Sequence, residues 1–207
     1  MDKQNSKEKI IKAGKDEFIS KGFKDASLRQ IAKKAGVTTG AIYAHFKDKE
    51  ALFEELISPA TTIMEDLFNN TSKEYKSLFY EAPKLKYIIW DKASERMKNH
   101  IEDIYKDYDA FKLLLCCSEG TKYSDFIFKL INESILGTKD YFRYLENKGI
   151  KIHQLSDREL EVLIHTHFSS IYEVVRRDMS YDEAKTYIDT INDFFSAGWM
   201  KILNFTV

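Results

Sequence analysis

Very few helix-breaking residues interrupt this chain, and that scarcity constrains its fold more than any other feature. Two prolines and eight glycines are spread over 207 residues. Because these two residue types are the least favourable in a helix interior, such a sequence allows long helices almost throughout. The 43% of hydrophobic residues also provide enough apolar side chains for a core. We therefore expect an all-α protein.

Basic residues are concentrated at the N-terminus. Residues 1–50 hold 12 Lys and Arg against 7 Asp and Glu, a balance of +5, whereas residues 51–207 hold 20 against 26, a balance of −6. A basic head on an acidic body fits a polyanionic partner that binds the head alone. A lysine-rich helix face that is merely solvated gives the same balance, so charge alone leaves both interpretations open.

The sequence carries no sign of secretion or of a membrane span. Its N-terminus is too charged for a signal peptide, and no apolar run approaches the ~18 residues that suggest a span. The only cysteines, Cys116 and Cys117, are adjacent, which favours a reducing compartment. We expect a cytoplasmic protein in which these cysteines pack as apolar side chains rather than form a redox switch.

Four helices are expected within the first 57 residues. Gly22 ends the first helix, which begins near residue 6. Ser27 is the N-cap of the second helix, a left-handed Gly36 ends it, and Asp48 caps the fourth. Residues 39–46 form the third. Two short helices joined by a tight glycine-containing turn, behind a bracing first helix, make a helix-turn-helix.

The third helix carries the residue types that DNA binding requires, because a helix-turn-helix pushes this helix into the major groove. Small residues at its start, Thr38, Thr39 and Gly40, can approach bases closely. Hydrogen-bond donors further along the chain, Tyr43, His45 and Lys49, can reach phosphates. Tyr43 and Phe46 also fit a role as core aromatics, which we favour for Phe46 only.

Residues 27–56 resemble the DNA-binding domain of the tetracycline-repressor (TetR) family. The family pattern is S/T-x-x-x-I-A-x-x-A-G-V-x-x-x-x-x-Y-x-H-F-x-x-K-x-x-L, and this chain matches it at Ser27, Ile31, Ala32, Ala35, Gly36, Val37, Tyr43, His45, Phe46, Lys49 and Leu52. The resemblance implies backbone contacts from Tyr43, His45 and Lys49, and base-facing positions at Thr38, Thr39 and Gly40. Ser27, which opens the pattern, is also counted as a DNA-binding candidate. The family often has a basic residue near position 39 and a large one at 44, so Thr39 and Ala44 leave the base preference open.

The rest of the chain resembles the variable regulatory body of the same family. We therefore expect a DNA-binding domain at 1–50 and a helical ligand-binding and dimerisation domain at 51–207. Apolar stripes independently predict helices there, including a hairpin at 157–203. That hairpin fits packing on its own body, whereas the resemblance implies a homodimer interface. The candidate dimerisation residues are Phe168, Ile171, Val175, Ile188 and Phe195.

An effector pocket is expected between the helices that carry residues 97–108 and 126–144. Ionisable groups on apolar faces suit a pocket with a few polar contacts, although a satisfied core histidine and a surface glutamate fit the same pattern. The aromatic faces and the negative body favour a flat aromatic or cationic small molecule over an anion. The candidate ligand-binding residues are Met97, His100, Ile104, Tyr108, Phe126, Glu133 and Tyr141.

The sequence contains no phosphate loop, zinc-protease or nucleophile-elbow motif. His165 and His167 are two residues apart, so on a helix they point in different directions and do not chelate together. We expect no enzyme, no cofactor and no metal. The interpretation we favour is a homodimeric repressor that a small-molecule effector releases from a palindromic operator in double-stranded DNA. The alternative is an architectural DNA-binding protein without an effector; an all-α enzyme is a distant third.

Overall fold

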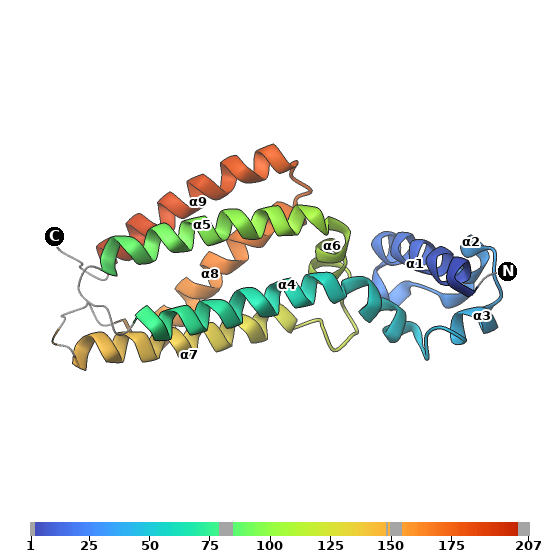
Figure 1. Cartoon of the computed structure of the whole chain (residues 1–207), viewed down its shortest axis with the longest axis horizontal. Helices are drawn as coiled ribbons and strands as arrows, with labels where there is room; N and C mark the ends of the chain where they lie inside the picture. Colours follow the sequence, from blue (N-terminus) through green and yellow to red (C-terminus); the bar gives the residue numbers. More distant parts are fainter. Residues whose placement is uncertain (1–2, 79–84, 148, 150–154, 203–207) are drawn as a thin grey trace. The chain divides into compact units, whose positions relative to one another are not determined.

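The structure, a computed structural model, describes residues 3–78, 85–147, 149 and 155–202. These residues form nine α-helices and no strand (Figure 1). The predicted all-α class, with an N-terminal helix-turn-helix followed by a helical C-terminal domain, is confirmed. None of the described helices combines the length and hydropathy that crossing a bilayer requires.

The chain folds into two compact units. The first comprises Met1–Ile63 and Asp107–Phe126, and the second comprises Met64–Lys106 and Ile127–Val207. The first unit holds α1 (Lys3–Asp25), α2 (Leu28–Ala35), α3 (Thr39–Tyr43), the start of α4 (Lys49–Leu78) and α6 (Tyr108–Cys116). The second holds the rest of α4, α5 (Leu85–Lys106), α8 (Asp157–Arg176), α9 (Tyr181–Ile202) and nearly all of α7 (Phe126–Asn147).

The predicted helix ends in the first unit are largely confirmed. Gly22 has a left-handed φ of 73° and kinks α1, which continues to Asp25. Gly36 ends α2 at φ 67° and ψ 33°, a conformation that glycine adopts without strain. Asp48 Oδ1 accepts a 2.7 Å hydrogen bond from the Ala51 amide at the start of α4.

The third helix is shorter than expected, because it ends at Tyr43 rather than at Phe46. The amides of His45 and Phe46 both donate to the carbonyl of Ile42, which closes a tight turn at this point. This turn directs Phe46 into the core, where 5% of the residue is exposed. Burial of that ring therefore takes precedence over continuing the helix.

Aromatic and aliphatic side chains hold the first unit together. The rings of Phe18 and Phe53 meet edge to face at 5.1 Å, which joins α1 to α4. The same two helices approach closely at Gly14, where a Cβ atom would lie 3.1 Å from a methyl carbon of Leu52. α6 is attached to α1 by a 2.8 Å hydrogen bond from the amide of Phe23 to the carbonyl of Cys117.

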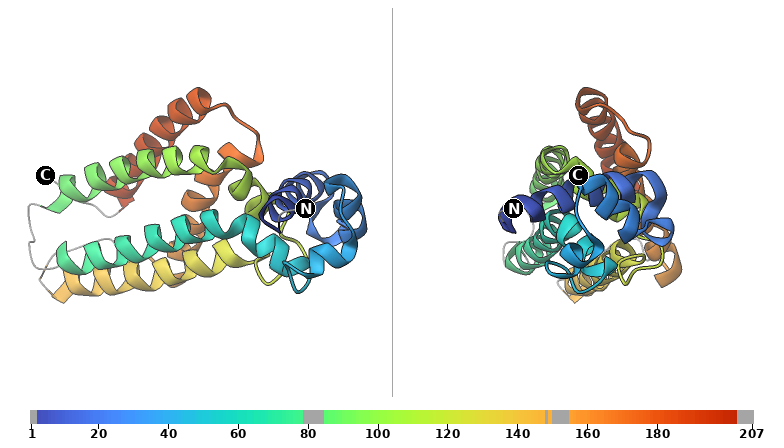
Figure 2. Two further views of the ribbon diagram at one scale, coloured as in Figure 1. Left: turned by 45° about the vertical axis from the view of Figure 1, so that its right-hand side comes forward. Right: turned by 90° about the vertical axis from the view of Figure 1, so that its right-hand side faces the viewer.

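Helix α8 is the centre of the second unit. Its Phe168 ring lies 5.1 Å from that of Phe68 on α4, and its Tyr172 ring lies 5.8 Å from that of His100 on α5. α9 stacks Phe195 on α8, and Figures 1 and 2 both show α9 running beside α5 and the second half of α4 running beside α7. Most of the apolar stripe of α8 therefore packs against other helices of the same chain.

Candidate nucleic-acid interface

The turn between α2 and α3 is held by its own backbone and one hydroxyl. Thr38 is the N-cap of α3, and its Oγ1 accepts a 3.2 Å hydrogen bond from the amide of Ala41. The amide of Val37 donates to the carbonyl of Ala32, beyond the left-handed Gly36. The start of α3 is thus fixed relative to α2 without help from its outward-facing side chains.

The outward face of α3 is small at its start and aromatic at its end. Gly40 is exposed, and Tyr43 is 56% exposed. A Cβ atom at Gly40 would meet only Thr38 Oγ1, at an ordinary 3.7 Å, and the backbone there does not have a positive φ. Glycine at this position is therefore not required by the packing or the backbone of the domain.

Two further candidates lie around this face. Ser27 has the extended backbone of an N-cap, but its hydroxyl makes no capping hydrogen bond to α2. His45 is half-buried, with its ring 6.3 Å from that of Phe46. Phe46 is a core residue, as expected, whereas the predicted DNA contacts of Ser27, Tyr43 and His45 remain predictions.

Lys49 has a different environment from the one that its place in the family pattern suggests. Its Nζ atom donates to the carbonyls of Phe23, Lys24 and Ala26, at 2.7, 3.2 and 3.0 Å. The same ammonium lies 4.4 Å from the centre of the Phe23 ring, and burial lowers its pKa, with Asp25 acting in the opposite direction. Because an ammonium has three donors, this geometry occupies all of them within the domain.

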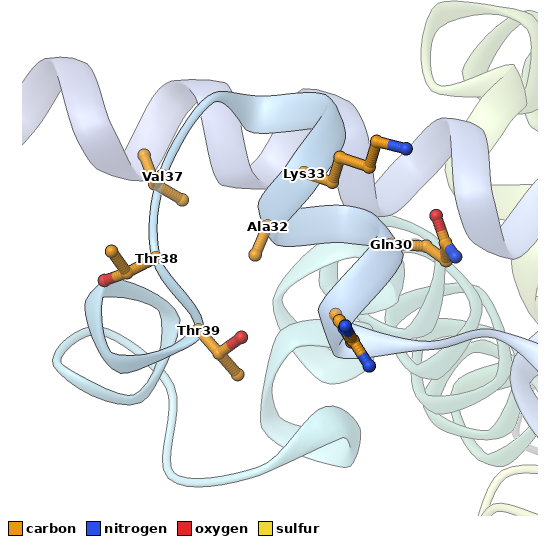
Figure 3. Close-up of a pocket in the computed structure, with 7 residues that line it drawn as sticks. Gln30, Ala32, Lys33, Val37, Thr38 and Thr39 are labelled. Atoms are coloured by element: carbon orange, nitrogen blue, oxygen red, sulfur yellow. The ribbon is translucent and has the colours of Figure 1, made fainter.

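A hollow of about 440 Å³ opens between α2 and the start of α3 (Figure 3). Figure 3 shows Gln30, Ala32 and Lys33 on α2, with Val37, Thr38 and Thr39 along the turn opposite. The complete lining is Arg29, Gln30, Ala32, Lys33, Val37, Thr38 and Thr39. Thr38 and Thr39 were predicted from the sequence, but the polar side chains of α2 were not. The available signal was Arg29, which is the only arginine in residues 1–95.

The predicted effector residues are divided between the two units. Met97, Ile104 and His100 are buried in α5, but α5 ends at Lys106, so Tyr108 belongs to α6 in the first unit. Phe126 also falls in the first unit, and Tyr141 is half-buried on α7. Glu133 is exposed to solvent. A charged carboxylate stays hydrated unless it is paired, and this exposure does not fit the expected interior position of Glu133.

The interior of the second unit instead contains neutral polar rings. Burial lowers the pKa of His100 to about 4, with Asp103 acting in the opposite direction, and burial lowers the pKa of His167 to about 4. Burial also raises the pKa of Tyr172, whose hydroxyl has no hydrogen-bond partner among the described residues. At neutral pH these groups are uncharged.

Most of the predicted dimerisation residues are core residues of the single chain. Ile171, Val175 and Ile188 are at most 1% exposed, because α8 and α9 turn these side chains toward each other and toward the rest of the unit. Phe168 and Phe195 are half-buried. The strongly exposed apolar residues of the same two helices are Val162, at 59%, and Phe194, at 71%. Sequence periodicity found the apolar side of each helix but did not separate these two environments.

Among the described residues, no group of three or more His, Cys, Asp or Glu side chains is placed to hold a metal ion. Cys116 is exposed at the end of α6, whereas Cys117 is buried and burial raises the pKa of its thiol. A raised thiol pKa disfavours the reactive thiolate. The geometry therefore supports a packing role for Cys117.

Comparison with known proteins gives matches to DNA-binding regulators. Residues 10–56 match the family of bacterial regulatory proteins called tetR. The chain is 32% identical over 107 residues to the uncharacterized HTH-type transcriptional regulator YdgC of Bacillus subtilis (strain 168), which covers 52% of this chain and 49% of YdgC. It is 39% identical over 62 residues to the HTH-type transcriptional repressor BepR of Brucella suis biovar 1 (strain 1330), which covers 30% of each. The chain thus spans about half the length of YdgC and less of BepR.

Structural similarity to known proteins covers more of the chain than sequence similarity does. The solved structure of native NalD from Pseudomonas aeruginosa, the secondary repressor of the MexAB-OprM multidrug efflux pump, aligns with a TM-score of 0.55. The alignment covers 92% of this chain and 96% of NalD at 22% identity, so it concerns the fold alone. The helix-turn-helix region of the N-terminal unit, residues 10–56, therefore belongs to the TetR family of bacterial regulatory proteins.

Proposed function

We propose that the chain is a sequence-specific DNA-binding regulator of transcription, acting as a repressor in the cytoplasm. In this proposal residues 1–50 bind the operator, and residues 51–207 bind an effector and form the dimer. The observation that carries the proposal is the exposed start of α3, where Gly40 has no role in the packing of the domain. Because the fold does not require glycine at this position, the absent side chain leaves room for α3 to approach the major groove closely.

The test is a binding selection from random duplexes with the full-length chain. A regulator is expected to enrich a short palindrome, because two heads on a symmetric dimer bind half-sites related by the same two-fold axis. An architectural protein, the alternative, would bind most duplexes alike, since phosphate contacts carry no sequence information. Enrichment of no motif would contradict the proposal.

Gly40 provides a mutational test of the same interface. We expect Gly40→Ala to keep or raise the free energy of unfolding, by up to about 1 kcal/mol, because alanine is the better helix former. The added methyl group should nevertheless weaken operator binding, and Gly40→Leu should weaken it further. Gly137→Ala on α7 is the matched control, since a Cβ atom there would meet nothing within 4 Å. If Gly40→Leu leaves the operator affinity unchanged, α3 does not approach the DNA closely at Gly40.

An effector would act by stabilising a dimer whose heads are wrongly spaced for the operator, which requires a coupling of ~1–3 kcal/mol. We propose that it is a neutral aromatic or apolar small molecule rather than a cation. The buried polar groups of the second unit, Tyr172 and His167, are uncharged at neutral pH, and Glu133 is exposed. A thermal-shift screen tests this, because a ligand raises apparent stability by about 2.7 kcal/mol at a hundred times its dissociation constant. Hits that are mainly cations and that Glu133→Gln abolishes would contradict the neutral class.

A further inference from the structure

One buried hydroxyl of the second unit is left unsatisfied within the part of the chain that the structure describes. Tyr172 on α8 is 1% exposed, and its hydroxyl has no hydrogen-bond partner among these residues. Buried polar groups are nearly always paired, because an unpaired one gives up its hydrogen bonds to water on folding and gains none in return. A ligand that supplies the missing partner would explain this hydroxyl.

Two other tyrosines of the same unit show how the fold usually satisfies such a group. The hydroxyl of Tyr105 donates a 2.6 Å hydrogen bond to the carbonyl of Met179, and that of Tyr187 donates a 3.0 Å hydrogen bond to the carbonyl of Ser170. At Tyr172, phenylalanine would fill the same space without burying an unpaired group. The packing of the unit therefore requires the ring of Tyr172 but not its hydroxyl.

Tyr172 packs against an apolar face of α5 that carries one neutral polar ring. The ring of His100 meets that of Tyr172 edge to face at 5.8 Å, and burial lowers the pKa of His100 to about 4, so this histidine is uncharged at neutral pH. Met97 and Ile104 lie about one turn to either side of His100 and are 9% and 0% exposed. A methionine adapts its shape readily, which suits the wall of a site that admits an apolar molecule.

The chemistry of Tyr172 defines the polar group that such a molecule would carry. Burial raises the pKa of Tyr172, so its hydroxyl keeps its proton and can donate it to an acceptor. A buried carboxylate acceptor would also need a cation, and Arg176, one turn further along α8, already pairs with Glu173 at 3.4 Å. A neutral carbonyl oxygen accepts the hydrogen bond without that requirement.

We propose that Tyr172 donates a hydrogen bond to the carbonyl of a neutral aromatic effector, and that it thereby selects ketones over hydrocarbons of the same shape. This inference rests on the proposed function, because it assigns a polar contact and a ligand class to the effector. Tyr172 is then the residue that determines specificity, whereas the apolar side chains beside it accept either kind of molecule.

The first part of the experiment compares the melting temperatures of full-length variants without ligand. Tyr172→Phe should raise the melting temperature by about 2–4 °C, because it removes an unpaired buried hydroxyl. Tyr105→Phe is the matched control and should lower it, since the carbonyl of Met179 loses its donor. If Tyr172→Phe melts at or below the wild-type temperature, the hydroxyl is already bonded in the free chain and the inference is wrong.

The second part is a thermal-shift titration with matched pairs of probes, in which a carbonyl oxygen takes the place of a methylene group. The pairs are acetylnaphthalene with isopropenylnaphthalene, and benzophenone with diphenylethylene. The wild-type chain should bind each ketone roughly 2- to 10-fold more tightly than its alkene, as one hydrogen bond allows. Tyr172→Phe should bind the two alike, whereas Tyr105→Phe should keep the preference.

The outcomes separate this inference from the proposed function. If the wild-type chain binds both members of each pair alike, binds no ketone, or shows a preference that Tyr172→Phe retains, the inference is wrong. Stabilisation by cations alone contradicts the neutral class of effector as well. A chain that enriches no motif from random duplexes contradicts the proposed function, whatever the ketones do.

Discussion

The ammonium group of Lys49 is bound within its own domain, although the family pattern predicts a contact with a DNA phosphate. Its three carbonyl partners lie at the end of α1 and in the link to α2, where helix termination leaves carbonyls without intrahelical partners. A lysine near a helix C-terminus is suited to binding them. We therefore regard Lys49 as a residue that holds α1, α2 and α4 together.

Replacing Lys49 with alanine should reduce the free energy of unfolding by roughly 1–2 kcal/mol, since carbonyls bound to a charged donor lose that donor. Operator affinity should fall as well, but the slope of log affinity against log salt should not change. Lys47→Ala is the control, because Lys47 is exposed on the same turn. Chemical denaturation and salt titration measure the two effects. Unchanged stability with a slope lower by about 1 would restore the phosphate contact that the sequence predicts.

The buried histidines make a second prediction, about pH. The pKa values of His100 and His167 are lowered to about 4, so the folded state binds fewer protons than the unfolded state between about pH 4 and 6.5. Their stabilisation is fully present above pH 6.5 and is lost as pH falls to 4, by on the order of 3 kcal/mol for each ring. Denaturation curves across this range should show the loss. His167→Phe, which keeps the stacking on Phe195, should remove about half of it; an unchanged pH dependence would contradict the assignment.

The ion pair between α1 and α2 is expected to stabilise the helix-turn-helix more than the exposed pairs around it. The carboxylate of Glu17 is nearly buried and lies 2.6 Å from Lys34 Nζ, whereas Lys7 and Glu55 form an exposed pair at 2.7 Å. Lys34→Ala leaves a carboxylate in the interior without its cation, which is costly, while an exposed pair contributes about 0–1 kcal/mol. Thermal melts should therefore show a clearly larger loss for Lys34→Ala than for Lys7→Ala. Equal losses would mean that water reaches Glu17.

The helices were more predictable from the sequence than the surfaces they present. Gly36 and Asp48 set helix boundaries through interactions with residues near them in the chain, so these boundaries can be predicted from the sequence. The early end of α3 follows from the burial of Phe46, and the engagement of Lys49 follows from carbonyls more than twenty residues away. Such tertiary contacts have no periodic signature. This is why the sequence predicts the helix boundaries but not the environment of Lys49.

The same distinction decides which residues can join two copies of the chain. A helix that packs on its own core on one side and on a partner on the other is apolar on both sides. The apolar periodicity of the sequence therefore does not distinguish the core-facing residues from the partner-facing ones. Ile171 and Ile188 are buried inside the chain, whereas Val162 on α8 and Phe194 on α9 stay exposed. Large exposed apolar side chains are typical of interaction sites. The homodimer that a palindromic operator requires is therefore expected to use the outer face of α8 and α9 rather than the predicted core positions.

We expect Val162→Asp and Phe194→Asp to produce folded monomers, because an exposed carboxylate costs the single chain little but opposes an apolar interface. Ile188→Asp should instead abolish folding, since it places a charge in the core. Sedimentation velocity at micromolar concentration measures the oligomeric state, and circular dichroism checks the helices. The monomeric variants should also lose tight binding to a full palindrome while keeping weak binding to a half-site, because two linked heads bind far more tightly than one. Dimers that persist in both variants would place the interface on another face of the chain.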